Sequence, residues 1–178
     1  MNKILFGIIF VFNVFSLWYL LSPTPTLPDL ANSIRSDLPG DTTQLKNVSA
    51  YFTNLSRTEV ITFYKANFNG PFRIQLNHPP EKAKEIIVDT IQSYYLEEFI
   101  LPFKQSIFIN GYDWQNDVFT KPEKRIANKM IYKDIEYQTK VTIKVFPTSI
   151  FQRLFGFFGT ELAIIIVFFI YRNLLKQK

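Results

Sequence analysis

A carboxylate lies inside an apolar segment of this chain. Glu161 stands within the stretch GTELAIIIVFF, and between residues 154 and 171 only Glu161 and Thr160 are clearly polar. Ionisable groups in a membrane-spanning helix are costly and mark candidates for ion coupling, proton coupling or a buried hydrogen bond. A second apolar run, residues 4–21, contains the amide of Asn13. Asn13 and Glu161 are therefore the first pair to consider for function.

The depths of these two residues match. Each apolar run has about 18 residues, roughly 27 Å as a helix, which fits the hydrocarbon core of a bilayer. Counted from the ends nearest the chain termini, Ile4 and Tyr171, Asn13 lies roughly 14 Å deep and Glu161 roughly 15 Å deep at the rise of a helix. Gly156 and Gly159 permit close helix approach. We predict antiparallel spans in which a protonated Glu161 bonds to the Asn13 amide. The alternative is that Glu161 faces another subunit or a defect at the lipid headgroups.

The remaining polar residues do not form a known catalytic or metal-binding motif. His78 is the only histidine and there are no cysteines, which excludes a zinc site with several nitrogen or sulfur ligands. In GYDWQND, the oxygens of Asp113, Asn116 and Asp117 lack the spacing of a calcium loop. No nucleophile elbow, phosphate loop or dinucleotide fingerprint occurs. We therefore predict no enzymatic activity, no metal and no cofactor.

Aromatic residues offer a candidate surface for a partner. They gather with one carboxylate in two short stretches, at Tyr94, Tyr95, Tyr112, Asp113 and Trp114. Large aromatic side chains are enriched at protein interfaces, although they equally supply ordinary core and rim. The charges of the central region are interspersed rather than blocked, so nucleic acid is not an expected partner.

The first apolar run is predicted to be an uncleaved anchor. Lys3 provides a short positive start, but the sequence after the run, SLWYLLSPTPTLP, has no small-residue cleavage site. Trp18 and Tyr19 suit the aromatic belt of a membrane interface. A removed signal peptide is the alternative.

Lys3 and the basic C-terminal tail predict that both termini are cytoplasmic and the central region extracytoplasmic. The expected partners are the lipid bilayer and another membrane or envelope protein. The predicted organisation is a first transmembrane helix (1–22), a Pro-rich linker (23–46), an extracytoplasmic domain (47–149), a second transmembrane helix (150–172) and a basic tail (173–178).

The central domain is predicted to be α+β, with a small antiparallel sheet and two helices on one face. Ser56 and Glu59 form a capping-box pattern at the start of the first helix. The order of elements is a strand at 47–54, a helix at 55–68, a strand at 71–77, a long helix at 78–101, a strand before a turn at Asn110-Gly111, and a hairpin of 128–137 with 139–146.

The long helix is expected to bury one apolar stripe. Its members recur at helical spacing and are Ala83, Ile86, Ile87, Thr90 or Ile91, Tyr94 and Phe99.

Two functions stay open for the whole chain. The first is a membrane-anchored envelope protein whose domain binds a protein, peptide or glycan without catalysis. The second is a subunit of a transport or signalling assembly that uses Glu161.

Overall fold

The computed structural model describes residues 3–39, 41, 46–87, 93–117 and 119–176. The chain divides into two compact units. The smaller unit combines both ends of the chain, residues 1–24 and 148–178, and the larger comprises residues 25–147.

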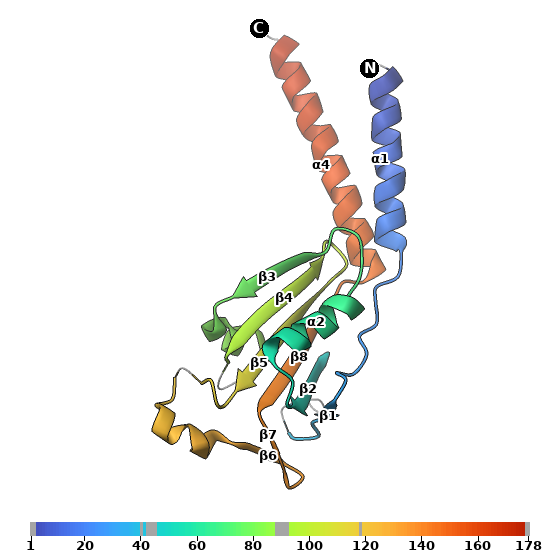
Figure 1. Ribbon diagram of the computed structural model, residues 1–178. Helices are drawn as coiled ribbons and strands as arrows, with labels where there is room; N and C mark the ends of the chain where they lie inside the picture. The colour runs from blue at the N-terminus through green and yellow to red at the C-terminus, as the bar shows by residue number, and fades with distance from the viewer. Residues whose placement is uncertain (1–2, 40, 42–45, 88–92, 118, 177–178) are drawn as a thin grey trace. The chain divides into compact units, whose positions relative to one another are not determined.

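The larger unit is α+β, as predicted (Figure 1). Six antiparallel strands form one sheet in the order β1-β2-β8-β5-β4-β3, and β6 pairs with β7 in a separate hairpin. The strands are β1 (Ser33–Arg35), β2 (Val48–Thr53), β3 (Ile74–His78), β4 (Tyr95–Leu101), β5 (Gln105–Asp113), β6 (Met130–Tyr132), β7 (Ile135–Tyr137) and β8 (Thr139–Pro147). The helices are α2 (Arg57–Asn67), α3 (Ala83–Ile87) and the 3₁₀ segments Pro80–Lys82 and Pro122–Asn128.

Helix α2 begins at the predicted capping box. The Ser56 backbone N–H donates to Glu59 Oε2 at 2.8 Å, and the Glu59 N–H donates to Ser56 Oγ at 3.4 Å. These bonds satisfy amide groups that the first helical turn leaves free. One face of α2 packs on the sheet through Val60 and Tyr64, and Phe68 follows directly after the helix. These side chains join Tyr51, Phe99, Ile107, Val141 and Ile143 in the main core.

The prediction of a single long helix over 78–101 is wrong. Only a 3₁₀ turn and α3 are helical there, and the later part is β4, which is paired with both β3 and β5. Tyr95 and Leu96 point to opposite faces of the sheet and are both buried. Since a central strand buries both faces, it lacks the apolar–polar alternation that identifies a strand in a sequence. Ala83 and Ile87 are buried as predicted, whereas Thr90 and Ile91 lie outside the described residues.

The two helices lie on opposite faces of the sheet, which corrects the prediction of one face. Val141 and Ile143 of β8 point toward α2. Lys144 alternates with them, and its Nζ donates to the carbonyl oxygen of Ile86 in α3 at 2.6 Å. Side chains alternate between faces along a strand, so α3 covers the other face.

The predicted turn at Asn110-Gly111 is also wrong, because β5 runs straight through it. A Cβ on Gly111 would lie 2.1 Å from two ring atoms of Tyr95, so the glycine makes room for that ring. The predicted hairpin of 128–137 with 139–146 is replaced by a smaller one within 130–137. There Lys133 and Asp134 both have positive φ, and β8 pairs instead with β2 and β5.

The folded unit begins earlier than the predicted boundary at residue 47. Leu30 is buried in the main core, and β1 adds a strand beside β2. Tyr51 Oη donates to Asp29 Oδ1 at 2.7 Å, which fixes the segment before β1. Much of the predicted Pro-rich linker is therefore part of the domain.

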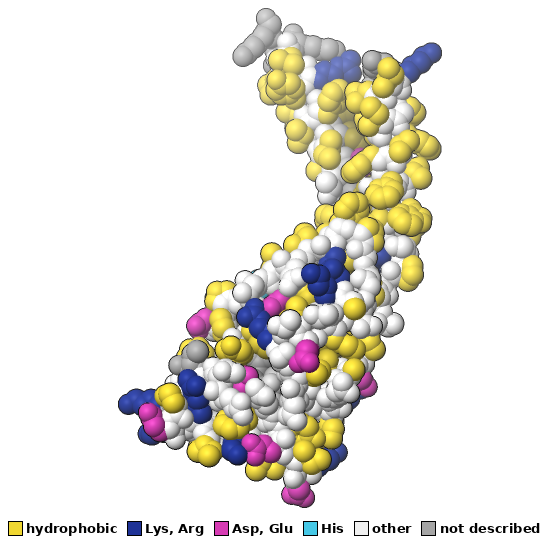
Figure 2. Space-filling view, in the orientation of Figure 1, with side chains coloured by type: hydrophobic (Ala, Val, Ile, Leu, Met, Phe, Trp, Pro, Cys, Tyr) yellow, Lys and Arg dark blue, Asp and Glu magenta, His cyan; other side chains and the backbone are white. Residues whose placement is uncertain are grey.

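The smaller unit consists of α1 (Lys3–Leu21) and α4 (Ile150–Lys176). Each helix is long and apolar enough to cross a membrane. Apolar side chains cover both helices and are largely exposed (Figure 2). The unit is compatible with a two-span membrane protein.

Candidate functional site

Arg153 joins the two helices of the smaller unit. Its Nη1 donates to the carbonyl oxygen of Leu20 at 3.1 Å, and its Nε donates to that of Thr148 at 2.9 Å. The last carbonyl groups of a helix have no partner within the helix, and a cation there also interacts favourably with the helix dipole. The buried Arg153 side chain therefore caps α1 and connects it to the first turn of α4.

The start of α4 has its own cap. Ser149 Oγ accepts from the Gln152 N–H at 3.2 Å, and Gln152 Oε1 accepts from the Ser149 N–H at 2.9 Å. This is the reciprocal pattern of a capping box. The sequence signal for this cap is Ser-x-x-Gln before an apolar run, which the sequence expectations above do not include.

Asn13 and Glu161 both lie on half-buried stripes of their helices. On α1 the half-buried positions include Asn13, Ser16 and Leu17, and on α4 they include Leu154, Phe157 and Glu161. Residues three or four apart share one face of a helix, and α1 contacts α4. Each stripe thus contains one of the two polar residues that the sequence singled out.

The amide of Asn13 has a partner in its own helix. Its Nδ2 donates to the carbonyl oxygen of Ile9 at 3.0 Å, and Thr160 Oγ1 similarly donates to that of Gly156 at 2.8 Å. Such bonds to the backbone satisfy a polar side chain in an apolar environment. Glu161 has no hydrogen-bond partner among the residues that the structure describes. The hydrogen bond between Asn13 and Glu161 remains a prediction.

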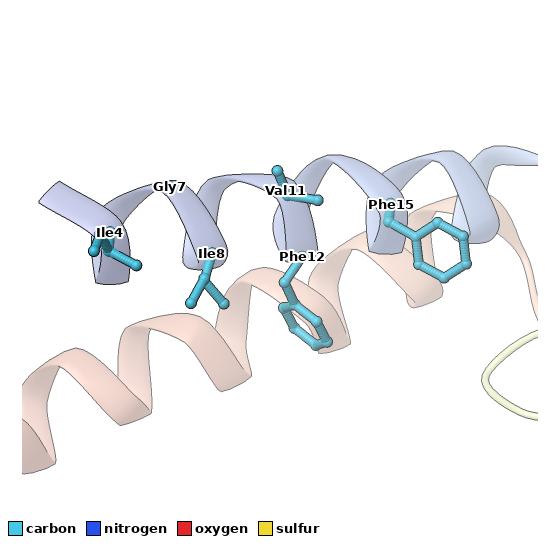
Figure 3. Close-up of a pocket in the computed structure, with 6 residues that line it drawn as sticks. All are labelled: Ile4, Gly7, Ile8, Val11, Phe12 and Phe15. Carbon is cyan, nitrogen blue, oxygen red and sulfur yellow. The ribbon is translucent and has the colours of Figure 1, made fainter.

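An apolar groove runs along α1 (Figure 3). Ile8 and Phe12 project from α1 toward α4 in this view. The groove is lined by Ile4, Gly7, Ile8, Val11, Phe12 and Phe15. None of these side chains carries a polar group, so the groove suits hydrocarbon and offers no chemistry.

Most of the predicted aromatic surface is in the interior of the domain. Tyr95, Asp113 and Trp114 are buried, whereas Tyr94 and Tyr112 are half-buried. Trp114 Nε1 donates to the carbonyl oxygen of Tyr137 at 3.1 Å, and Asp113 accepts from the Gln115 and Asn116 amides. Three of the five side chains therefore contribute to packing rather than to an exposed surface.

The buried carboxylate of Glu97 is fully engaged. Arg57 donates to its Oε1 through Nε at 3.0 Å and Nη2 at 2.7 Å, and Gln75 donates to its Oε2 at 2.6 Å. The guanidinium also lies 5.2 Å from the centre of the Tyr95 ring. These contacts attach the start of α2 to β3 and β4, and both carboxylate oxygens are occupied by hydrogen bonds.

The polar loop after β5 is likewise satisfied internally. Asp117 accepts from the Phe119 N–H at 2.9 Å and from Asn128 Nδ2 at 3.4 Å. Burial alone raises the pKa of Asp117, but hydrogen bonds from Thr120, Phe119 and Asn128 and the charge of Arg125 outweigh it and lower the pKa. No cluster of three potential metal ligands occurs in the described residues. His78 instead contacts Glu98 at 2.8 Å across β3 and β4.

The chain matches no family model, no curated protein and no solved structure. The features of the chain that bear on its function are the two apolar helices, the contact that Arg153 makes between them, and Glu161.

Proposed function

We propose that this chain is a two-span membrane protein whose α+β domain lies outside the cytoplasm and binds a partner protein. The observation that carries this proposal is the pairing of two apolar helices from opposite ends of the chain, with α1 capped by Arg153 of α4. A helix with this much exposed apolar surface is stable in lipid rather than in water. The pair of helices α1 and α4 anchors the domain at both of its ends.

The candidate partner surface lies in the segment between β5 and β8. This segment leaves the sheet at Asp113 and returns at Thr139, which is the end of β8 farther from α4. It carries large apolar side chains in exposed positions, at Phe119, Ile126, Ile131 and Ile135. Apolar groups exposed on a projecting segment are typical of protein contacts.

A second candidate function uses Glu161. An intramembrane carboxylate without a partner within the described residues favours assembly with a further membrane subunit, in which it couples to an ion or proton. Two spans alone make no pathway, so this function requires other chains.

Topology is tested with single cysteines, since the chain has no native cysteine. Lys121→Cys in the domain and Asn173→Cys near the end of α4 are both exposed positions. On intact cells, an impermeant thiol reagent is expected to label position 121 and to leave position 173 unlabelled until the cells are opened. Labelling of position 173 alone would reverse the proposed orientation.

The two functions are separated by co-purification from the native membrane. We expect a stably co-purifying partner to be lost when Ile131→Gln and Ile135→Gln are combined. Both side chains are exposed, so the double substitution is expected to remove a binding surface without unfolding the domain. The matched variant Glu161→Gln is expected to keep that partner. If the partner is lost with Glu161→Gln and retained with the double variant of Ile131 and Ile135, the result would instead support a subunit that couples to an ion or proton through Glu161.

A further inference from the structure

Two turns of the larger unit repeat the same three-residue pattern. Pro71-Phe72-Arg73 precedes β3, and Pro102-Phe103-Lys104 joins β4 to β5. The strand register pairs Ile74 with Ile100 and Gln105 with both Leu101 and Pro147. Both turns therefore lie at the same end of the sheet as the last residue of β8. Figure 1 shows β3 starting and β4 finishing at this end.

Both phenylalanines have a backbone conformation that favours glycine. Phe72 has φ 62° and Phe103 has φ 61°. The Lys104 N–H donates to the Leu101 carbonyl oxygen at 2.9 Å, which closes a tight turn with Phe103 in its third position. A positive φ at that position is normally supplied by glycine, and a bulky residue there is uncommon. Folding of the turn alone does not account for phenylalanine.

Both rings are largely exposed. Phe72 is 62% exposed and Phe103 is 78% exposed. At the same end of the sheet, Phe146 of β8 is also exposed, and it packs edge-to-face on Phe108 with centroids 5.5 Å apart. Phe72, Phe103 and Phe146 are called the aromatic rim below.

The basic residue of each turn is already engaged within the domain. Arg73 Nη1 donates to the carbonyl oxygen of Phe68 at 3.2 Å and to Asn69 Oδ1 at 3.2 Å. The Lys104 side chain is buried. The rim therefore presents apolar rings rather than free charge, and its occupant has to be apolar.

The short connection between β8 and α4 indicates which apolar surface the aromatic rim can contact. Strand β8 ends at Pro147 and α4 begins at Ile150, so at most ~11 Å of extended chain joins these two residues. Segments that lie in the membrane interface bury Phe, Trp and Leu side chains at the boundary between headgroups and acyl chains. We propose that Phe72 and Phe103 insert into the interfacial layer of the bilayer that holds α4, which sets the orientation of the domain on the membrane. This inference rests on the proposed membrane anchoring.

The test uses nitroxide labels on single cysteines in the full chain, reconstituted in nanodiscs of phosphatidylcholine. Phe72→Cys and Phe103→Cys report on the rim, and Phe119→Cys is the matched control at the other end of the sheet, where the phenylalanine is also exposed. Val167→Cys reports on α4. Collision with oxygen relative to a water-soluble nickel chelate is expected to be high at 72, 103 and 167 and low at 119. Because the rim carries no free charge, added salt should not change this.

The outcomes separate the two ideas. A hydrocarbon signal at 167 with water-like signals at 72 and 103 overturns the insertion of the rim and leaves the anchoring intact. A water-like signal at 167 overturns both. As a second readout, Phe103→Gly is expected to keep or raise the melting temperature of the full chain while lowering the oxygen signal at 72. A lower melting temperature would assign the Phe103 ring to packing and overturn the inference.

Discussion

Replacing Gly111 with alanine is expected to cause the larger unit to unfold at a much lower temperature. The new Cβ would lie 2.1 Å from Cε1 and Cζ of the Tyr95 ring, and Tyr95 is itself fully packed in the core. Overfilling a core costs about 1–3 kcal/mol and occasionally more. With total stabilities of about 5–15 kcal/mol, a loss of this size is readily seen in the near-ultraviolet circular dichroism of the full chain in detergent.

A second substitution tests the cause. Tyr95→Leu removes the ring atoms that the new methyl group contacts. The loss of stability in the double variant is therefore expected to be smaller than the sum of the losses in the two single variants. Gly159→Ala serves as the matched control, because a Cβ there meets no neighbouring atom. Additive effects of the two substitutions would refute the proposed contact between position 111 and the ring.

Replacing Ile87 with aspartate is expected to abolish the native fold of the larger unit. Ile87 is 2% exposed in α3, and the nearby ammonium of Lys144 is already bonded to the Ile86 carbonyl oxygen. An unpaired carboxylate in such a place costs several kcal/mol, comparable with the stability of a domain of this size. The expected result is loss of the cooperative thermal transition of the full chain in detergent.

Lys84→Asp is the control for this prediction. It introduces the same side chain three positions earlier, on an exposed part of α3, and is expected to leave the melting temperature nearly unchanged. If Ile87→Asp melts like the parent, α3 does not pack on the sheet in solution.

Features with a local physical cause were predictable from the sequence. The capping box of Ser56 and Glu59 needs only residues within one helical turn. Val141, Ile143 and Val145 alternate with polar residues because only one face of β8 meets the main apolar core. Asn13 and Glu161 were visible because a polar side chain in an apolar run stands out in any environment.

Features that depend on distant contacts were not predictable. Strand β4 has the composition of a buried helix because it lies between two strands and most of its side chains are buried. Asn110-Gly111 resembles a turn, but its glycine is explained by the ring of Tyr95 in the adjacent strand. Leu30 is buried in the core, but it stands outside any helix or strand pattern in the sequence. The cap that Arg153 provides becomes apparent only once both ends of the chain meet.

Strand β8 gives the molecule a mechanical property. It pairs with β5 from Thr139 to Pro147 and with β2 from Thr139 to Lys144, and it continues within three residues into α4. Hydrogen bonds in a sheet are perpendicular to the strands, so a pull on α4 along β8 loads both ladders in shear, and many bonds must break at once. The chain from α1 enters the sheet instead through β1, an edge strand with a single neighbour. Tension on α1 and α4 would therefore separate β1 from β2 first, while β8 stays paired with β2 and β5.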